Sequence, residues 1–262
     1  MATGTTVSIL PCGAMTADLT WLLLAPGRAI RNRQNKHMPA EWVDVPTHAV
    51  LVDTPDGKLL WDTSCPRDWE THWAPTGLQD FFPYEKVSDD EYLDSRLKQL
   101  GVAPGDIDYV VLSHLHFDHA GNNELFRDAT IYVQRQHFEV AKELPAFPNE
   151  YFDIPGLKYE LIDGEPELFP GVRMILTPGH APWHQSLLVS LKADGNVLLC
   201  SDAIYCQDNI DHDAWGGQAE PEVARESAQK LLKIADEKDA FMVYGHDPDQ
   251  WRRLRKVPAY YA

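Results

Sequence analysis

The segment Val110–Asn123, VVLSHLHFDHAGNN, places three histidines and an aspartate within six positions, directly after an apolar run. These residues are His114, His116, Asp118 and His119. Both ring nitrogens of a buried imidazole need partners, so crowding histidines together is unfavourable unless one ligand binds them jointly. A metal ion is the usual ligand of such a cluster. The segment therefore predicts a metal site at the end of a buried strand.

Three later apolar segments also end in a side chain that can bind a metal. His180 closes TPGH, Asp202 closes LLCSD, and His246 lies in VYGHD. Taken singly, each has an ordinary explanation, because a histidine at a strand end is often structural and an aspartate there often caps a turn. Strand ends on one edge of a packed sheet are rigid and converge on a common crevice. We therefore expect all three side chains at the same site as the histidine cluster.

The number of candidate ligands favours two ions over one. Five histidines and two aspartates are too many for a single tetrahedral zinc ion. Two positions apart in an extended chain, His114 and His116 point the same way. We expect them to hold the first ion together with His180.

The second ion is assigned to the residues after the bend. Asp118 and His119 would hold it with His246, and Asp202 can bridge both ions because a carboxylate has two oxygens. Nitrogen and oxygen ligands without sulfur suit zinc, iron, cobalt or manganese. We expect two divalent metal ions per chain, with zinc as the first choice.

The hydrophobic pattern predicts strands, helices and a hairpin in an order that suits two packed sheets with helices outside. A helix is expected from Ser88, which has capping-box spacing to Glu91, to a stop at Gly101. The segment 65–87 is aromatic but without a period, and we interpret it as a loop. Strands are expected over 5–10, 107–112, 130–133, 172–180, 185–191, 196–202 and 240–247, a hairpin over 47–64, and further helices over 135–144 and 221–236.

Composition limits the classes of partner. A net charge of −17 argues against nucleic acid and against anionic membrane surfaces, since both repel such a field. The N-terminus has no basic region followed by an apolar stretch, and no apolar run approaches the roughly 18 residues of a spanning helix. We therefore expect a cytoplasmic protein. The four cysteines form no C-x-x-C pair and are expected to be free thiols.

Four segments together resemble the metallo-β-lactamase superfamily: SHLHFDHAG, TPGHAPWHQS, SDAIY and GHD. Within it, the chain looks most like the quorum-quenching N-acyl homoserine lactone lactonases. The H-x-H-x-D-H motif alone fixes only the superfamily, which also includes glyoxalase II, β-lactamases, RNA-processing nucleases and sulfatases. The resemblance covers most of the chain. It implies an α+β fold, an αββα sandwich of two mixed sheets flanked by helices, as a single domain 1–262 with the active site at one edge.

The resemblance also implies a mechanism. Tyr205, three residues after Asp202, matches a tyrosine that hydrogen-bonds the substrate in the lactonases. Two adjacent ions lower the pKa of a bridging water, and the resulting hydroxide would attack the lactone carbonyl. Tyr205 would stabilise the oxyanion and Asp118 would pass a proton to the leaving oxygen. The product is a ring-opened hydroxy acid.

An acyl-homoserine lactone has an aliphatic tail that needs an apolar channel. One departure from the lactonases is Trp183, where they often have glycine. The aromatic loop also offers Trp73 and Phe81. The candidates for substrate binding are Met15, Trp21, Trp69, Phe82, Phe117 and Trp183.

Other polar residues have supporting or ordinary interpretations. Asp62, at the end of a hairpin strand, could accept a hydrogen bond from a ligand histidine and fix its tautomer. His184 is expected to have a structural or supporting role. The histidines without a surrounding motif are expected at the surface; they are His37, His48, His72, His137 and His212.

Alternative functions remain at this point. A lactonase for pyridoxine-derived or other small lactones, or a glyoxalase II-like thioesterase, would use the same scaffold. A nuclease of the superfamily is disfavoured by the acidity, and a purely structural metal site is disfavoured because such sites are closed, mononuclear and thiolate-rich. Residues Arg28–Pro46 resemble an excursion that joins a dimer interface in related lactonases, so we expect a homodimer.

Overall fold

The computed structural model describes residues 4–24, 41–73 and 76–262. Most of the expected dimerisation segment, residues 28–40, and His37 lie outside the described residues. The strands are β1 (Thr6–Asp18), β2 (Trp42–Thr54), β3 (Gly57–Trp61), β4 (Tyr109–Val111), β5 (Thr130–Gln134), β6 (Lys158–Ile162), β7 (Glu167–Phe169), β8 (Val172–Leu176), β9 (Gln185–Ser190), β10 (Asn196–Ser201) and β11 (Ala240–Tyr244). The α-helices are α1 (Leu19–Leu22), α2 (Trp69–Trp73), α3 (Leu93–Gln99), α4 (Phe117–Ala120), α5 (Arg135–Ala141), α6 (Gln207–Asp211), α7 (Pro221–Lys238) and α8 (Pro248–Trp251).

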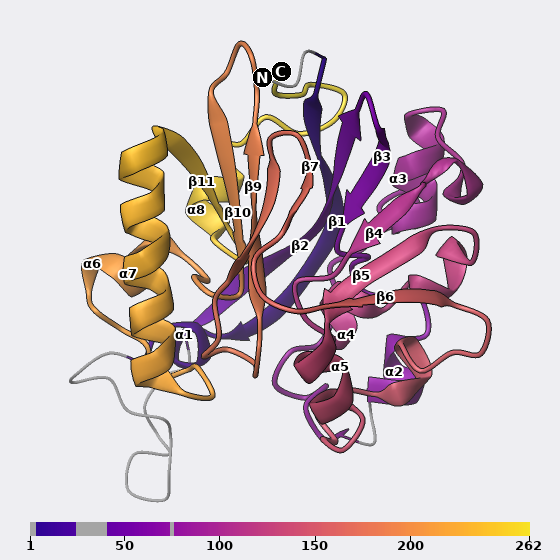
Figure 1. Cartoon of the computed structure of the whole chain (residues 1–262). Helices are drawn as coiled ribbons and strands as arrows, with labels where there is room; N and C mark the ends of the chain where they lie inside the picture. Colours follow the sequence, from indigo (N-terminus) through magenta and orange to yellow (C-terminus); the bar gives the residue numbers. More distant parts are fainter. Residues whose placement is uncertain (1–3, 25–40, 74–75) are drawn as a thin grey trace, which may run out of the picture.

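Two mixed sheets pack face to face, with helices on their outer sides (Figure 1). The first has the order β1-β2-β3-β4-β5-β6, antiparallel up to β3 and parallel from β3 to β6. The second has the order β11-β10-β9-β8-β7, with only β10 and β11 parallel. The expected αββα sandwich of two mixed sheets is confirmed.

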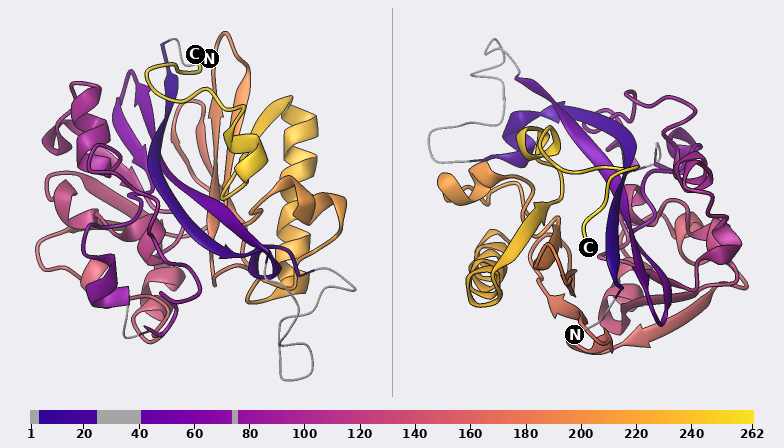
Figure 2. Two further views of the ribbon diagram at one scale, coloured as in Figure 1. Left: turned by 180° about the vertical axis from the view of Figure 1, so that it is seen from behind. Right: turned by 90° about the horizontal axis from the view of Figure 1, so that it is seen from above.

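Alternation along the strands explains the layers. In β9, Leu187 and Val189 face the other sheet, whereas Leu188 packs with Ala224 and Leu231 of α7. A strand buried on both faces has no polar side, and this accounts for continuous apolar runs such as LLV. Figure 2, seen from above, shows α7 on the outer side of the second sheet and the helices of the other half on the outer side of the first.

The first sheet buries its outer face in the same way. Leu93 and Leu97 of α3 and Phe138 of α5 pack in one cluster with Val110 and Ile131 of the central strands. Both sheets are thus fixed from two sides, and the loops that leave their ends are held on a rigid frame.

Several predicted boundaries need correction. The helix expected from Ser88 begins at Leu93, although Ser88 N and Oγ do bond Glu91 Oε2 at 3.0 and 2.8 Å. These contacts belong to a separate turn before the helix. The backbone is extended at Tyr92, with a ψ of 149°, and α3 begins only after this residue. The aromatic loop contains the short helix α2, and strands β6 and β7 were not predicted. The hairpin of β2 and β3 is confirmed, and the four cysteines are free and buried.

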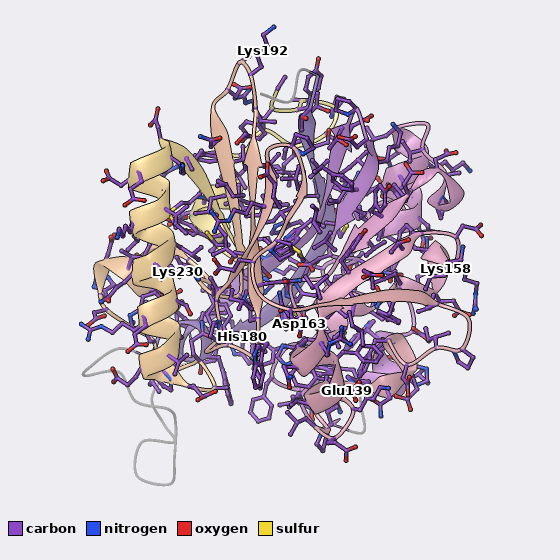
Figure 3. All side chains as sticks on the ribbon, in the orientation of Figure 1. Glu139, Lys158, Asp163, His180, Lys192 and Lys230 are labelled. Atoms are coloured by element: carbon purple, nitrogen blue, oxygen red, sulfur yellow. The ribbon has the colours of Figure 1, made fainter. Side chains whose placement is uncertain are left out.

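The residues predicted to bind metal lie at one end of the sandwich. His180 is found low between the two halves in Figure 3, whereas Lys192, in the β9–β10 connection, lies at the opposite end. The segments after β3, β4, β8, β10 and β11 all reach this lower edge. Among the described residues, no helix is long and apolar enough to cross a membrane.

Candidate metal centre

Three imidazoles from two sheets meet at one point. His114 and His116 follow β4, and His180 follows β8. Nδ1 of His116 lies 2.9 Å from both Nε2 of His114 and Nε2 of His180, and the last two are 3.1 Å apart. We call these residues the three-histidine group.

Hydrogen bonds among the rings cannot satisfy this triangle. Each ring nitrogen offers either one N–H or one lone pair, so three nitrogens that face each other can form one hydrogen bond and leave the third nitrogen without a partner. The nitrogens of a tetrahedral zinc site, each about 2.05 Å from the ion, would be about 3.3 Å apart. The observed triangle is close to this size, so the three residues fit a divalent ion.

A second set of donors lies beside the first. Asp118 and His119 belong to α4, Asp202 follows β10, and His246 follows β11; their ligand atoms all lie within 4.8 Å of one another. We call them the four-residue group. Nε2 of His119 and Oδ1 of Asp202 are buried and have no hydrogen-bond partner among the described residues. Buried polar atoms without partners are rare, and a cation between them would satisfy both.

Asp202 connects the two groups. Its Oδ1 lies 3.2 Å from Nε2 of both His119 and His246, whereas its Oδ2 lies 3.3 Å from Nε2 of His180. Each carboxylate oxygen thus faces a different group. The chain makes room for this side chain with glycine, because a Cβ at Gly245 would lie 2.8 Å from Asp202 Oδ1.

The outward nitrogens of the same rings are held by the protein. Nδ1 of His119 bonds Asp62 Oδ2 at 2.9 Å, Nδ1 of His246 bonds the Pro46 carbonyl at 2.8 Å, and Nδ1 of His114 lies 2.9 Å from Ser113 Oγ. Such contacts fix the tautomer and aim the other nitrogen at the site. The expected hydrogen bond from a histidine of the cluster to Asp62 is confirmed.

His180 differs from the other histidines in its partners. Its Nδ1 lies 2.9 Å from the Tyr205 hydroxyl and 3.0 Å from Gln218 Oε1. Gln218 is buried, and its Nε2 donates to the Asp202 carbonyl at 3.0 Å. The ring of His180 is therefore fixed from behind by a tyrosine and an amide.

Burial and charge act differently on the two groups. Burial lowers the pKa of His114 and of His180, and it lowers the pKa of His116 to about 3. In the four-residue group burial opposes protonation too, but the carboxylates of Asp202 and Asp118 outweigh it and raise the pKa of His119 and His246. The three histidines are thus held neutral, whereas in the four-residue group the two carboxylates favour the protonated form of the neighbouring histidines.

An apolar cavity opens onto both groups. Its volume is about 530 Å³, within the usual range for small-molecule sites. His116, Asp118, His180, Asp202 and His246 line one end together with Tyr205; we call this end the floor. The remaining lining is mainly apolar, and we call it the wall; its residues include Met15, Trp21, Leu22, Trp73, Phe82 and Phe117.

Comparison with known proteins identifies the family to which this chain belongs. Residues 42–246 match the metallo-β-lactamase superfamily. The chain belongs to that superfamily. Within it, the chain is 34% identical over 227 residues to the N-acyl homoserine lactonase AiiA of Bacillus thuringiensis subsp. kurstaki, covering 85% of this chain and 89% of AiiA. It is 36% identical over 235 residues to the N-acyl homoserine lactonase AttM of Rhizobium radiobacter, covering 84% and 88% of the two chains.

Solved structures of N-acyl homoserine lactone hydrolases have the same fold as this chain over nearly its whole length. A B. thuringiensis AiiA variant with N-decanoyl-L-homoserine at its active site has a TM-score of 0.85, with 29% identity and coverage of 97% and 98%. An N-acyl homoserine lactone hydrolase with N-hexanoyl-L-homoserine at its catalytic metal centre has a TM-score of 0.83, with 30% identity and the same coverage.

The residues expected from the sequence to bind substrate divide into those that line the cavity and those that do not. Met15, Trp21, Phe82 and Phe117 line the cavity, and Phe117 stacks on Trp73 with ring centroids 4.1 Å apart. Trp69 and Trp183 are not among the described residues that line the cavity, so a contact of either with the substrate stays a prediction.

Packing and backbone conformation explain why Trp69 and Trp183 lie outside the lining. Trp69 packs with Tyr84 in the layer behind the wall, with ring centroids 6.5 Å apart. Trp183 has a left-handed φ of 51° and is 42% exposed, and its neighbour Pro182 lines the cavity instead. A tryptophan is strained in this conformation, which glycine adopts freely.

Some residues of the site carried no sequence motif. Gln218, Leu144 and Phe147 line the cavity, and Phe147 stacks on the His116 ring at 4.5 Å. Gly217 also lines it, where a Cβ would lie 1.9 Å from the Trp21 carbonyl oxygen. Only a glycine at position 217 lets the loop 215–218 pack this closely against α1. The glycine pair Gly216–Gly217 was the available sequence signal for this close approach.

His137 was expected at the surface and is fully buried. Its Nε2 accepts a hydrogen bond from the Leu115 amide at 2.9 Å, between the two histidines of the H-x-H segment. It shares the buried face of α5 with Phe138 and Ala141, and that helical spacing was the available signal. His184 is also buried and bonds Thr177 Oγ1 at 2.9 Å, as expected for a supporting residue.

Proposed function

We propose that the chain is a metal-dependent hydrolase that opens the lactone ring of N-acyl homoserine lactones. The observation that carries the proposal is the meeting of two metal-binding groups and a tyrosine at the floor of an apolar cavity. Curated relatives named N-acyl homoserine lactonase, at 34% and 36% identity over most of the chain, support the substrate class.

Two divalent ions are proposed as cofactors, zinc first. The three-histidine group would hold one ion, the four-residue group the other, and Asp202 would contact both. When bound, such ions supply Lewis acidity and lower the pKa of water toward about 7, so that a nucleophile exists at neutral pH.

Tyr205 is proposed to donate a hydrogen bond to the oxygen of the attacked carbonyl. Its hydroxyl can accept the Nδ1 proton of His180 at 2.9 Å, and this leaves its own hydrogen free for the substrate. Burial, with the Asp202 and Asp118 charges, raises the pKa of Tyr205 well above its ordinary value. The tyrosine therefore stays protonated and can act as a donor in a water-poor site.

Asp118 is proposed to carry the proton to the leaving ring oxygen. Burial opposes its charge, but contacts with His119 and His246 at 3.4 and 3.6 Å lower its pKa. An ionised carboxylate that lines the cavity floor can accept a proton during attack and return it to the alkoxide.

The wall is proposed to bind the acyl chain. Trp21, Phe82 and the Trp73–Phe117 stack present apolar surface next to the floor. A neutral, amphiphilic lactone suits a chain of net charge −17 better than an anionic substrate does.

The test is hydrolysis by metal-reconstituted protein. N-hexanoyl and N-decanoyl homoserine lactones are each incubated beside S-lactoylglutathione, and acid release is followed by pH-stat. We expect ring opening of both lactones, a mass increase of one water, and no comparable thioester hydrolysis. Hydrolysis of the thioester without the lactones would refute the proposal in favour of the glyoxalase II-like alternative. His116→Gln serves as the variant with an impaired floor.

The same proposal includes the setting of the enzyme. We propose that residues 1–262 act as a single domain, that the protein is a cytoplasmic homodimer, and that it binds neither nucleic acid nor membranes. Light scattering after gel filtration measures the mass of the assembly, and a mass of 29.7 kDa would contradict the dimer.

A further inference from the structure

Ser113 occupies the junction behind the two metal-binding groups. It follows β4, is 1% exposed, and its amide donates to Asp62 Oδ1 at 2.7 Å. Its hydroxyl oxygen lies 2.8 Å from Asp62 Oδ2, 2.9 Å from Nδ1 of His114 and 2.9 Å from Ser201 Oγ. One hydroxyl thus contacts a carboxylate, an imidazole of the three-histidine group and the end of the other sheet.

The hydrogens of this network can be assigned without conflict. His114 offers Nε2 to its group, so its single N–H is on Nδ1 and donates to Ser113 Oγ. Ser201 donates to the second lone pair of Ser113, and the Ser113 hydroxyl donates to Asp62 Oδ2. That oxygen also accepts Nδ1–H of His119 at 2.9 Å. Every donor and every acceptor site on Ser113 Oγ is used.

Asp62 and Ser201 reach this arrangement from unusual backbone conformations. Their φ angles of 56° and 48° lie in the left-handed region, which is unfavourable for residues other than glycine. Asp62 follows β3 of one sheet and Ser201 ends β10 of the other. The network therefore joins the two sheets directly behind the site, at two positions where the chain adopts a strained conformation.

We propose that Ser113 is a positioning residue that extends the influence of Asp62 to both metal-binding groups. Asp62 orients His119 of the four-residue group directly and His114 of the three-histidine group through the Ser113 hydroxyl. A single buried carboxylate thereby fixes the Nδ1–H tautomer of one histidine in each group, and Ser201 holds the relay from the second sheet. The inference rests on the metal sites of the proposed function.

The experiment measures metal affinity in the full chain without substrate. Zinc is titrated against a chromophoric chelator to give two dissociation constants, and the constant that His116→Gln abolishes belongs to the three-histidine group. We expect Ser113→Ala to weaken that constant by about 10–100-fold, with a smaller change at the four-residue group. Asp62→Asn should weaken both constants, and the cobalt absorption spectrum should change in each variant.

Two further variants separate positioning from folding. Ser113→Thr keeps the hydroxyl and should restore the affinity to within about threefold of the parent, since the relay remains. Ser201→Ala removes only the supporting donor and should cost a few-fold at the three-histidine group.

Ser186→Ala is the matched control. Ser186 is fully buried, and its hydroxyl bonds Thr177 Oγ1 and the Cys200 carbonyl, each at 2.9 Å, outside both groups. We expect it to leave both constants unchanged.

The proposal is overturned if Ser113→Ala leaves the zinc dissociation constant of the three-histidine group unchanged. It is also overturned if Ser113→Ala weakens zinc binding no more than Ser186→Ala does. A chain that shows the expected affinity pattern but opens no lactone contradicts the proposed function alone.

Discussion

The floor and the wall of the cavity are built on different physical terms. The floor consists of ionisable side chains that follow β4, β8, β10 and β11, and each of its histidines has close polar partners. The wall consists of apolar side chains from the N-terminal strand, from short helices and from connecting segments. Its contacts are ring against ring, such as Trp21 with Phe82 at 5.7 Å.

This difference separates chemistry from selection. A charged group on a rigid strand end holds its position to a fraction of an ångström, which metal binding and bond cleavage require. Apolar contact is non-directional and scales with the buried area, so the wall can bind chains of different length. Changes in the floor should therefore affect every lactone equally, whereas changes in the wall should depend on the acyl chain.

The largest expected effect is at Asp202, the residue shared by both groups. Asp202→Asn keeps the shape but removes the charge that faces His119, His180 and His246. We expect kcat/KM to fall by about 10³-fold, or about 4 kcal/mol, for short and long lactones alike, with reduced metal content. Metal analysis and initial rates measure both. Asp163→Asn, an exposed carboxylate paired with Arg135, is the control. A loss confined to one chain length would break the distinction between floor and wall.

The next effect concerns a floor residue outside both metal-binding groups. Tyr205→Phe removes only the hydroxyl that faces His180 and the cavity. We expect kcat to fall by about 10²-fold with metal content unchanged, because one donor to the developing oxyanion is lost. Steady-state kinetics on metal-loaded protein test this expectation. An unchanged kcat would show that Tyr205 only supports the His180 ring.

The floor of the cavity could be predicted from the sequence more completely than the wall. The side chains of the floor follow strands in short motifs, so the hydrophobic pattern and the spacing located all seven donors that the two groups contain. The wall carries no motif, and an aromatic residue is equally suited to a core or to a pocket. The sequence accordingly could not tell that Trp69 and Trp183 lie outside the described cavity lining, whereas Met15, Trp21, Phe82 and Phe117 lie within it.

Other features depend on tertiary contacts and not on local pattern. Gln218 matters because folding brings its amide to His180, which is 38 residues away in the sequence. The network of Asp62, Ser113 and Ser201 likewise joins three strand ends from two sheets. Strands β6 and β7 were missed because none of their residues is fully buried, so neither shows a clear apolar run.

A wall substitution should give a smaller and selective effect. Phe82→Ala removes one aromatic side chain that contacts Trp21. We expect kcat/KM for N-decanoyl homoserine lactone to fall about 10-fold, and that for a butanoyl lactone to change less than about twofold, since the short chain buries less area. Phe241→Ala, a 43% exposed phenylalanine outside the described lining, is the control. Equal losses for both lactones would place Phe82 with the floor.

The smallest effect on catalysis is expected at His137, beneath the floor, where a substitution should act on stability alone. Burial lowers the pKa of His137 to about 4, from 6.5 in the unfolded chain. As pH falls below about 6.5 the unfolded state takes up the proton first, so the parent protein should lose about 2 kcal/mol between pH 7.5 and pH 5 through this group.

Gln in place of His137 can still accept the Leu115 amide and does not titrate, so His137→Gln should lose that much less over the same interval. Urea unfolding of metal-saturated protein at both pH values measures the difference. His212→Gln, at an exposed position, is the control for replacing a histidine by glutamine elsewhere in the chain. If His137→Gln keeps the pH dependence of the parent, His137 is not the neutral acceptor that holds the H-x-H segment.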